Sequence, residues 1–418
     1  MLNQTEHNAN SSSLGGAVNR PLIIMVALFF LFGFVTAMND VLMPHVKLLF
    51  DLSFMQASFV NFAFFIAYLV FGLPAGWLIS KIGYKKGIML ALSILVLGMI
   101  LFILTPEFGT FAMVLVALFV IGSGMTILQV AANPYIITLG SPETGSSRLN
   151  LAGGFNSFAS MINTFIGGSL LLVPADSSIP EKFEAMRGPF FFIAAVVLIF
   201  AIIIGISKLP EIKYETRQDL SSSNIRGLWE YKHLFLGAGA IFFYVGAEVS
   251  IGNILIDYLH QPKMGGYTSA DAKWFVLFYW MTCMIGRFLG FITLQKVKAE
   301  RGLIFVSIMA VYFVFVGMFT SGVVSRTSII MIGLCNSIMW PCIFPLSLSG
   351  LGKYTSRGSG LLVTMVFGGA LIPLFQAYLA EYVMGYNLSF IVVLFCYLYI
   401  LYFALVGHKW ARQSAMEH

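Results

Sequence analysis

The chain has 418 residues, of which 59% are hydrophobic and only 10% are charged. Soluble domains have about 45–50% apolar and about 25% charged residues, so this apolar excess is more than a water-soluble core can enclose. The composition therefore argues against a soluble enzyme, a nucleic-acid binder and a secreted disulfide scaffold. The net charge of +6 instead indicates Lys and Arg gathered on the cytoplasmic loops of a membrane protein.

The chain begins with a polar segment, residues 1–20, which predicts a disordered cytoplasmic tail because it lacks the basic region and cleavage site of a signal peptide. After it come twelve apolar stretches, most of them long enough to cross the bilayer as helices. They lie at about 22–43, 58–79, 88–105, 111–138, 151–173, 189–207, 234–258, 271–294, 301–321, 327–349, 358–383 and 389–407. We therefore predict an all-α, multi-pass membrane protein of twelve transmembrane helices.

The longest polar connection contains EIKYETRQDLSSSNIRG and divides the spans six and six. We expect an N-terminal six-helix bundle over 21–207, a cytoplasmic linker over 208–233, a C-terminal six-helix bundle over 234–407 and a cytoplasmic tail over 408–418. Placing both termini in the cytoplasm puts most Lys and Arg residues on cytoplasmic loops, as the positive-inside rule requires. The expected location is the plasma membrane, the inner membrane of a bacterium.

The two predicted bundles carry matching residues at a nearly constant separation. The pairs are Asp40 and Glu248, 208 positions apart, Pro134 and Pro341, 207 apart, and Arg148 and Arg357, 209 apart. The loop GWLISKIGYKKG at 76–87 also resembles GFITLQKVKAERG at 290–302. These marks indicate a duplicated unit, and duplicated bundles favour a transport site at the midplane between two pseudo-symmetric halves.

Asp40 lies inside an apolar stretch, where an ionised carboxylate costs about 2.5–3.5 kcal/mol on insertion scales. It must face the bundle interior, stay protonated or hold a cation, and a coupling-ion site is the preferred interpretation. The alternative is a structural, hydrogen-bonded Asp near the helix end, since Pro44 follows closely. The neighbouring Asn39 is equally suited to be a second oxygen ligand or an interhelical hydrogen-bond partner.

Three amides of the N-terminal half are predicted to bind a ligand rich in hydroxyl groups, such as a sugar. Gln129 and Asn133 are four residues apart and share a helix face, and Asn156 follows two glycines that permit close helix approach. An amide both donates and accepts hydrogen bonds, as a sugar hydroxyl does. The alternative is that these amides only join helices.

The C-terminal half offers a second set of candidates. Glu248, with Asn253 nearby, is the counterpart of Asp40 and is predicted to contact the sugar, although it could instead pair with Arg287 or Lys273 as a clamp between helices. The aromatic candidates for stacking on a hexose ring are Trp340, which shares a helix face with Asn336, and the adjacent Tyr279 and Trp280. Such aromatic residues are otherwise packing or lipid-facing groups.

The sequence gives little support for nucleotide hydrolysis, enzymatic catalysis or a structural metal site. The chain has no P-loop sequence, its histidines lie in the tails or near span ends, and its four cysteines, Cys283, Cys335, Cys342 and Cys396, form no C-x-x-C pair. We therefore expect no enzyme activity, no bound cofactor and no metal site other than a co-transported ion. The competing class is a passive channel or an intramembrane enzyme.

Several motifs resemble those of a known family. The loop from Gly76 to Gly87 resembles the major facilitator superfamily, and five further motifs resemble its fucose/glucose/galactose symporter family, in particular the glucose/galactose transporter branch. These are NDVLMP at 39–44, QVAANPY at 129–135, RLNLAGGFNSF at 148–158, YVGAEVSIGN at 244–253 and GRFLG at 286–290. The resemblance covers residues 20–407.

The resemblance implies alternating access around a central site, with a cytoplasmic motif that clamps the N-terminal half in the outward-facing state. The residues expected to form this motif and its gates are Gly76, Lys81, Gly83, Lys85, Lys86, Arg148 and Arg357. The implied substrate is a sugar of the glucose, galactose, mannose or fucose class, and the implied assembly is a monomer.

The coupling ion is where the sequence departs from the proton-coupled fucose branch. That branch has a Glu just before AANP, and this chain has Gln129, so a relay between two carboxylates of the N-terminal half does not carry over. Oxygen ligands at Asp40, Asn39 and Gln129 slightly favour Na⁺ over H⁺. A proton-coupled, fucose-type symporter is the alternative.

Overall fold

The computed structural model describes residues 20–52, 54–170, 179–210 and 228–410, and within these ranges the regular structure is entirely helical. The long helices of the first half are α2 (Arg20–Leu49), α3 (Phe54–Ile82), α4 (Tyr84–Ile103), α6 (Phe111–Thr138), α7 (Gly145–Leu170) and α8 (Ile179–Ile206). Those of the second half are α9 (Lys232–His260), α10 (Ser269–Thr293), α11 (Ala299–Phe319), α12 (Gly322–Asn336), α13 (Met339–Leu348), α14 (Thr355–Thr364), α15 (Gly368–Tyr382) and α17 (Ile391–Leu405).

Short elements connect the long helices. They are α5 (Thr105–Phe108), α16 (Gly385–Ser389) and the 3-10 turns η1 (Pro142–Thr144), η2 (Leu228–Glu230), η3 (Pro262–Met264), η4 (Gly352–Tyr354), η5 (Met365–Phe367) and η6 (Gly407–Lys409). The expected tails and most of the expected linker lie outside the described residues.

Each predicted span coincides with helix in the structure, but two spans are broken. The span 327–349 divides into α12 and α13, and the span 358–383 divides at η5 into α14 and α15. Pro341 sits in the first turn of α13, where a missing backbone N–H is tolerated, so the break lies just ahead of it. Among the described residues, eleven helical segments are long and apolar enough to cross a membrane, and α7, rich in Gly, Ser and Asn, is not one of them.

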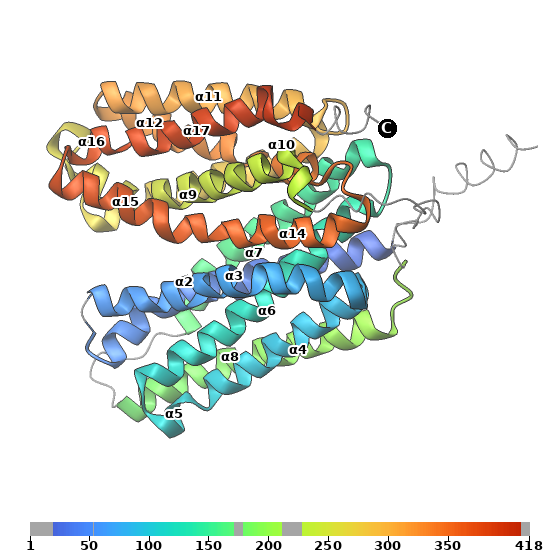
Figure 1. The fold of residues 1–418 in the computed structure, drawn as a ribbon. Coiled ribbons are helices and arrows are strands. Elements are labelled where there is room, and N and C mark those ends of the chain that lie inside the picture. Colours follow the sequence, from blue (N-terminus) through green and yellow to red (C-terminus); the bar gives the residue numbers. More distant parts are fainter. Residues whose placement is uncertain (1–19, 53, 171–178, 211–227, 411–418) are drawn as a thin grey trace, which may run out of the picture.

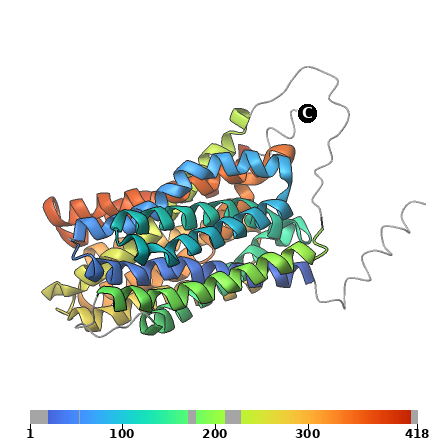
Figure 2. The same cartoon turned by 90° about the horizontal axis from the view of Figure 1, so that it is seen from below.

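The helices form two groups that run along one common direction (Figures 1 and 2). In Figure 1 the blue to green helices α2–α8 lie below the yellow to red helices α9–α17. Because successive helices run antiparallel, one end of the molecule collects the basic loop residues Lys81, Lys85, Lys86, Arg148, Lys353 and Arg357. We call this the basic end and the other the opposite end.

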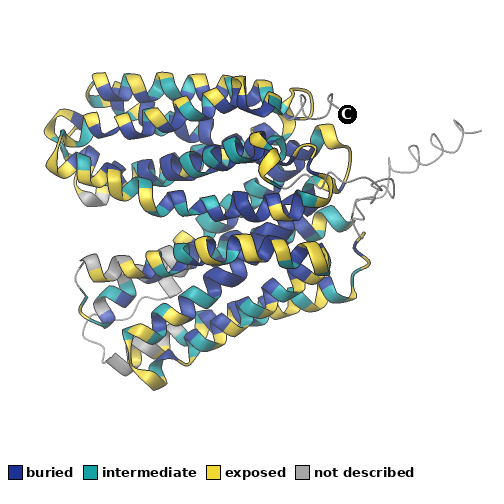
Figure 3. Cartoon of the chain, viewed as in Figure 1, coloured by how far each residue is buried: buried dark blue, intermediate teal, exposed yellow. Residues whose placement is uncertain are grey.

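The outer helices present apolar side chains to their surroundings. Phe191 on α8, Phe305 on α11 and Phe395 on α17 are each more than 60% exposed, and exposed positions follow the outer faces of both groups in Figure 3. Water would disfavour so large an apolar surface, whereas lipid accepts it. The exposed faces of these helices are therefore suited to the hydrocarbon of a bilayer.

The two halves meet through equivalent helices. The second long helix of each half packs on the fifth span of the other, so that α3 contacts α14 and α10 contacts α7. The contacts lie toward the basic end, where the hydroxyl of Ser147 donates to the carbonyl of Phe291 at 2.6 Å and the hydroxyl of Ser356 hydrogen-bonds the Tyr84 hydroxyl at 3.0 Å. Ser147 and Ser356 are 209 positions apart, which matches the repeat seen in the sequence.

Glycines allow α3 and α14 to approach this closely. A Cβ atom at Gly76 would lie 2.7 Å from the carbonyl oxygen of Ser356, and one at Gly360 would lie 2.5 Å from the carbonyl oxygen of Gly72. Both distances are below any normal contact, so larger side chains would force the helices apart. The glycine of the sequence motif thus serves the closure of the basic end.

Gly76→Leu should therefore open the basic end. Spin labels at Ser80→Cys and Lys353→Cys, both exposed at that end, should report a longer distance between the halves. The native cysteines are buried, which keeps labelling selective. Gly188→Leu is the matched control because a Cβ there meets nothing within 4 Å. An unchanged distance in Gly76→Leu would show that this contact does not set the closure.

Candidate functional site

A largely buried arginine joins the two halves. Arg287 of α10 forms an ion pair with Glu248 of α9, with 3.4 Å between Nη2 and Oε1. Its Nη1 also donates to the carbonyl of Gly153 at 3.2 Å and to the hydroxyl of Ser157, both on α7. Of the two partners that the sequence left open for Glu248, Arg287 is the one present. Lys273 lies nearly four helical turns away along α10 and is exposed.

The Glu248 carboxylate has a second partner. The hydroxyl of Tyr244, one turn earlier on α9, donates to Oε1 at 2.9 Å. The side chains of Arg287 and Glu248 are only 15% and 12% exposed. An unpaired charge at such a place would be costly, so the ion pair and its hydrogen bonds are what permit both groups to stay.

A line of hydroxyl and amide groups extends from Glu248 into the C-terminal half. The hydroxyl of Tyr279 donates to the backbone carbonyl of Glu248 at 3.0 Å and accepts from Nδ2 of Asn336 at 2.9 Å. The Tyr397 hydroxyl donates to Oδ1 of Asn336 at 2.7 Å. Asn336 is fully buried, and these two bonds fix its orientation. We refer to Tyr244, Glu248, Tyr279, Arg287, Asn336 and Tyr397 as the C-half network.

The predicted amides of the N-terminal half are placed on α6 and α7. Nε2 of Gln129 donates to the hydroxyl of Tyr68 at 2.7 Å. Asn133, one turn further along α6, is buried, and its Nδ2 has no hydrogen-bond partner among the described residues. Nδ2 of Asn156 donates to the carbonyl of Phe29 at 3.2 Å. Asn156 is adjacent in sequence to Ser157, and so lies next to the contact that α7 makes with Arg287.

The remaining residues predicted to bind the sugar, Trp340, Trp280 and Asn253, differ in their burial. Trp340 is half-buried, stacks on Phe344 with ring centroids 5.4 Å apart, and lies 6.4 Å from the Tyr244 ring. Trp280 is 40% exposed and covers Gly252, next to the exposed Asn253. Trp340 is therefore close to the C-half network. The Trp280 ring also lies near it, with its centroid 5.1 Å from that of Tyr279, but the Trp280 and Asn253 side chains are exposed.

The side chains of Asn39 and Asp40 lie outside the described residues. The backbone at both positions belongs to α2, which packs along α7. A Cβ at Gly33 would lie 2.0 Å from the carbonyl oxygen of Asn156, so α2 and α7 touch backbone to backbone. Asp40 follows Gly33 by about two turns on the same helix. Asn39, Asp40 and Asn156 thus belong to one closely packed pair of helices, whereas Gln129, the third proposed coupling residue, lies on α6.

Two of the five basic side chains in the predicted gate motif cap helices. Arg148 donates to the backbone carbonyls of Ile136, Ile137 and Ser141 at the end of α6. The Lys85 amine donates to the carbonyls of Gly205 and Ser207 at 2.9 and 2.8 Å, at the end of α8. Positive groups at helix C-termini donate hydrogen bonds to the backbone carbonyls that have no partner within the helix.

The other members of the motif occupy the surface of the basic end. The Lys81 amine lies 3.5 Å from the centre of the Trp77 ring, and Lys86 and Arg357 are exposed. Gly83 has a φ of 83°, a left-handed conformation that suits glycine at the turn between α3 and α4. Gly76 therefore shapes the contact between the halves, Gly83 shapes the turn between α3 and α4, and Lys85 caps the end of α8.

Sequence reasoning missed part of the site. The hydroxyls of Tyr68, Tyr244 and Tyr397 form its hydrogen bonds, but the chain has 17 tyrosines and no spacing distinguishes these three. Arg287 did carry a signal, because it is a basic residue within an apolar span.

The arrangement is that of a carrier rather than of an enzyme. Two pseudo-symmetric helix groups meet at a buried network of carboxylate, guanidinium, amide and hydroxyl groups, which can exchange hydrogen bonds with a polyhydroxylated ligand. Residues 25–373 match the Major Facilitator Superfamily, and the chain belongs to this family.

Comparison with relatives shows which transporters of the superfamily this chain is similar to. A glucose/galactose transporter of Brucella abortus is 41% identical, and the match covers 93% of this chain and 94% of that protein. An L-fucose-proton symporter of Escherichia coli is 29% identical, over 92% of each chain. A solved structure of the superfamily transporter FucP in the outward conformation has a TM-score of 0.84 and 27% identity, and covers 93% of this chain and 98% of that one. This chain is a sugar transporter of the superfamily.

Arg287→Ala should destabilise the protein by about 3–5 kcal/mol, because it leaves the Glu248 carboxylate buried without its countercharge. Glu248→Gln should cost less, since an amide still accepts the Tyr244 hydroxyl, and it should recover part of the loss when combined with Arg287→Ala. Thermal unfolding followed by tryptophan fluorescence measures these differences, with Lys273→Gln as the control. Equal midpoints for Arg287→Ala and Lys273→Gln would contradict the role of the ion pair.

Proposed function

We propose that the protein takes up a hexose of the glucose or galactose type together with a cation, by opening its two ends in turn. The observation that carries the proposal is the contact of Arg287 with both Glu248 and α7. Closure of the basic end depends on a buried polar network that spans both halves, so a ligand that rearranges these hydrogen bonds would alter the balance between the two ends.

The sugar would bind between the two sets of polar groups. Nδ2 of Asn133 is a buried donor without a described partner, and a sugar hydroxyl would satisfy it. Asn156 lies beside the Arg287 contact on the same half, and Trp340 offers a ring face close to Tyr244 on the other. The names of the relatives support a hexose as the ligand.

The proposed coupling residue is Asp40, with Asn39 and Gln129 as further oxygen ligands. Glu248 is already neutralised by Arg287, and position 129 carries an amide that cannot take up a proton as a carboxylate does. Asp40 is then the acidic side chain best suited to couple an ion, and its oxygen-rich neighbours favour Na⁺. The relative in E. coli is an L-fucose-proton symporter, which favours H⁺ as the alternative.

The orientation is part of the proposal. If the basic loops face the cytoplasm, as the positive-inside rule requires, the structure is closed on the cytoplasmic side and corresponds to an outward-facing state. Both termini would then lie in the cytoplasm, and the protein would act as a monomer in the plasma membrane.

Uptake of labelled galactose or glucose into proteoliposomes tests the function. An inward Na⁺ gradient at constant pH should drive accumulation, whereas an inward proton gradient without Na⁺ should not. Accumulation under the proton gradient alone would replace Na⁺ by H⁺ in the proposal. Linear, unsaturable flux without accumulation under either gradient would identify a channel and overturn it.

Asp40→Asn should abolish ion-driven accumulation while leaving sugar counterflow partly intact. The amide has nearly the size of the carboxylate and still offers one oxygen ligand, but it lacks the charge that would bind the cation. Asp257→Asn, an exposed carboxylate near the end of α9, is the matched control and should accumulate normally. Accumulation by Asp40→Asn at the unsubstituted rate would remove Asp40 from the coupling site.

Asn156→Ala should weaken sugar binding about tenfold, since loss of one or two hydrogen bonds is worth about 1–1.5 kcal/mol each. The concentration for half-maximal counterflow measures this effect. Thr164→Ala, two turns further along α7 and exposed, is the control for insertion and folding. An unchanged half-maximal concentration would exclude Asn156 from the pocket.

A further inference from the structure

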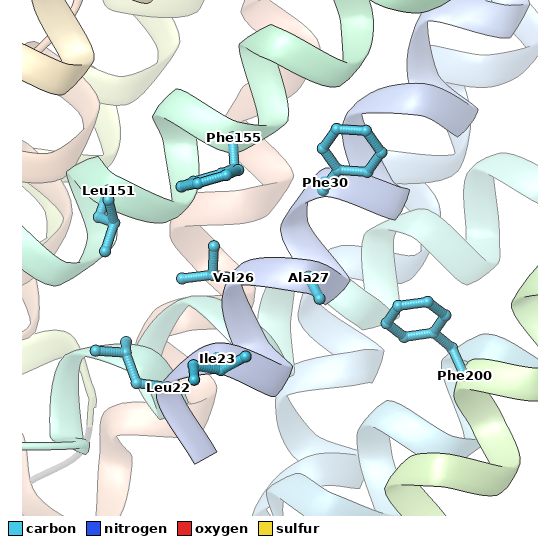
Figure 4. A pocket seen from close by; sticks show the side chains of 8 residues that line it. All are labelled: Leu22, Ile23, Val26, Ala27, Phe30, Leu151, Phe155 and Phe200. Atoms are coloured by element: carbon cyan, nitrogen blue, oxygen red, sulfur yellow. The ribbon is translucent and has the colours of Figure 1, made fainter. Parts of the chain in front are cut away.

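An apolar crevice of about 500 Å³ opens on the outer side of the N-terminal half (Figure 4). Its floor is a stripe of α2 that includes Leu22, Val26 and Phe30, and its walls are formed by α7, through Phe155, and by α8, through Phe200. The crevice exists because α7 and α8 both pack on α2 but barely touch one another. All of its lining side chains are apolar, and its volume is within the range of about 300–1,000 Å³ typical of small-ligand sites.

The depth of the crevice identifies the leaflet it faces. Its lining residues lie between 2 and 10 positions from the ends of α2, α7 and α8 at the basic end. At about 1.5 Å per residue this is roughly the outer 15 Å of the helices. The hydrocarbon core of a bilayer is about 30 Å thick, so the crevice spans about one leaflet.

Two exposed basic residues lie at the basic-end termini of helices that line the crevice. Arg20 begins α2 two residues before Leu22, and Lys208 follows the end of α8, and both are exposed. They lie at the level where lipid headgroups meet the ends of membrane helices, and basic residues there attract anionic headgroups. The crevice is apolar and as deep as one leaflet, and basic residues lie at the helix ends beside it. This depth and this charge suit a phospholipid.

We propose that this crevice is a specific site for one anionic phospholipid of the basic-end leaflet, with an acyl chain between α7 and α8 and the phosphate near Arg20 and Lys208. The acyl chain fills the space between α7 and α8, which make few contacts with each other among the described residues. Phe155 also packs edge to face against Phe288 of α10, with ring centroids 5.6 Å apart. The α7 wall of the crevice therefore also contacts the C-terminal half. The site is independent of the sugar and of the coupling ion.

Quenching by brominated lipid tests the proposal on the full chain in proteoliposomes. A tryptophan introduced by Phe200→Trp reports the crevice, and one introduced by Ile199→Trp, at the same depth and 54% exposed, reports ordinary lipid contact. Brominated phosphatidylglycerol is titrated into phosphatidylcholine, and the signal of the unsubstituted protein is subtracted. Phe200→Trp should reach half-maximal quenching at a mole fraction at least about threefold lower than Ile199→Trp, a difference of about 0.65 kcal/mol.

Three comparisons make the outcome decisive. Brominated phosphatidylcholine should quench both positions alike, and Arg20→Gln combined with Lys208→Gln should abolish the preference for phosphatidylglycerol. Phe30→Trp is a second crevice reporter if Phe200→Trp does not fold. Coincident curves for crevice and control positions in phosphatidylglycerol would show ordinary boundary lipid and overturn the proposal. An equal preference for both lipids would overturn the assignment to an anionic headgroup.

Discussion

The structure depends on one constraint, which is that charged and polar groups placed among hydrocarbon must find their partners within the protein. Arg287 and Glu248 show how the fold meets it. The guanidinium reaches the carboxylate on α9 and two acceptors on α7, so its partners come from both halves of the chain. Arg287 has all its partners only when the two halves are close together. The relative position of the halves therefore affects the electrostatic energy of the site.

The duplication explains why the halves meet as they do. Ser147 and Ser356, 209 positions apart, each form a hydrogen bond with the other half at the basic end, and the packing of α3 on α14 mirrors that of α10 on α7. Arg287 has no such counterpart, because the position equivalent to it on α3 is the apolar Leu73, if Gly76 and Gly290 are matched. The symmetric contacts are suited to closing the end, and the asymmetric arginine to linking that closure to the residues proposed to bind sugar.

The sequence was sufficient for the helices and for much of the chemistry. Apolar length predicts most of the spans, because the bilayer imposes it, but α7 does not stand out by apolar length among the described residues. The match of Asp40 with Glu248 indicates the repeat. The break before Pro341 was not predicted, since proline is compatible with both a kinked and an interrupted helix. The partners of Arg148 were also not predictable, because they are backbone carbonyls of α6 that the fold alone brings near. Tyrosine hydroxyls such as that of Tyr397 left no pattern, since one polar atom does not alter the periodicity of an apolar helix.

The central claim is that the Glu248–Arg287 pair and its contacts with α7 hold the basic end closed. Distances between spin labels at Ser80→Cys and Lys353→Cys, measured in liposomes, test it most directly when Arg287→Gln is compared with the unsubstituted chain. We predict that Arg287→Gln shifts the population toward longer distances at this end, while Lys273→Gln does not. The same distance distribution in all three proteins would contradict the claim.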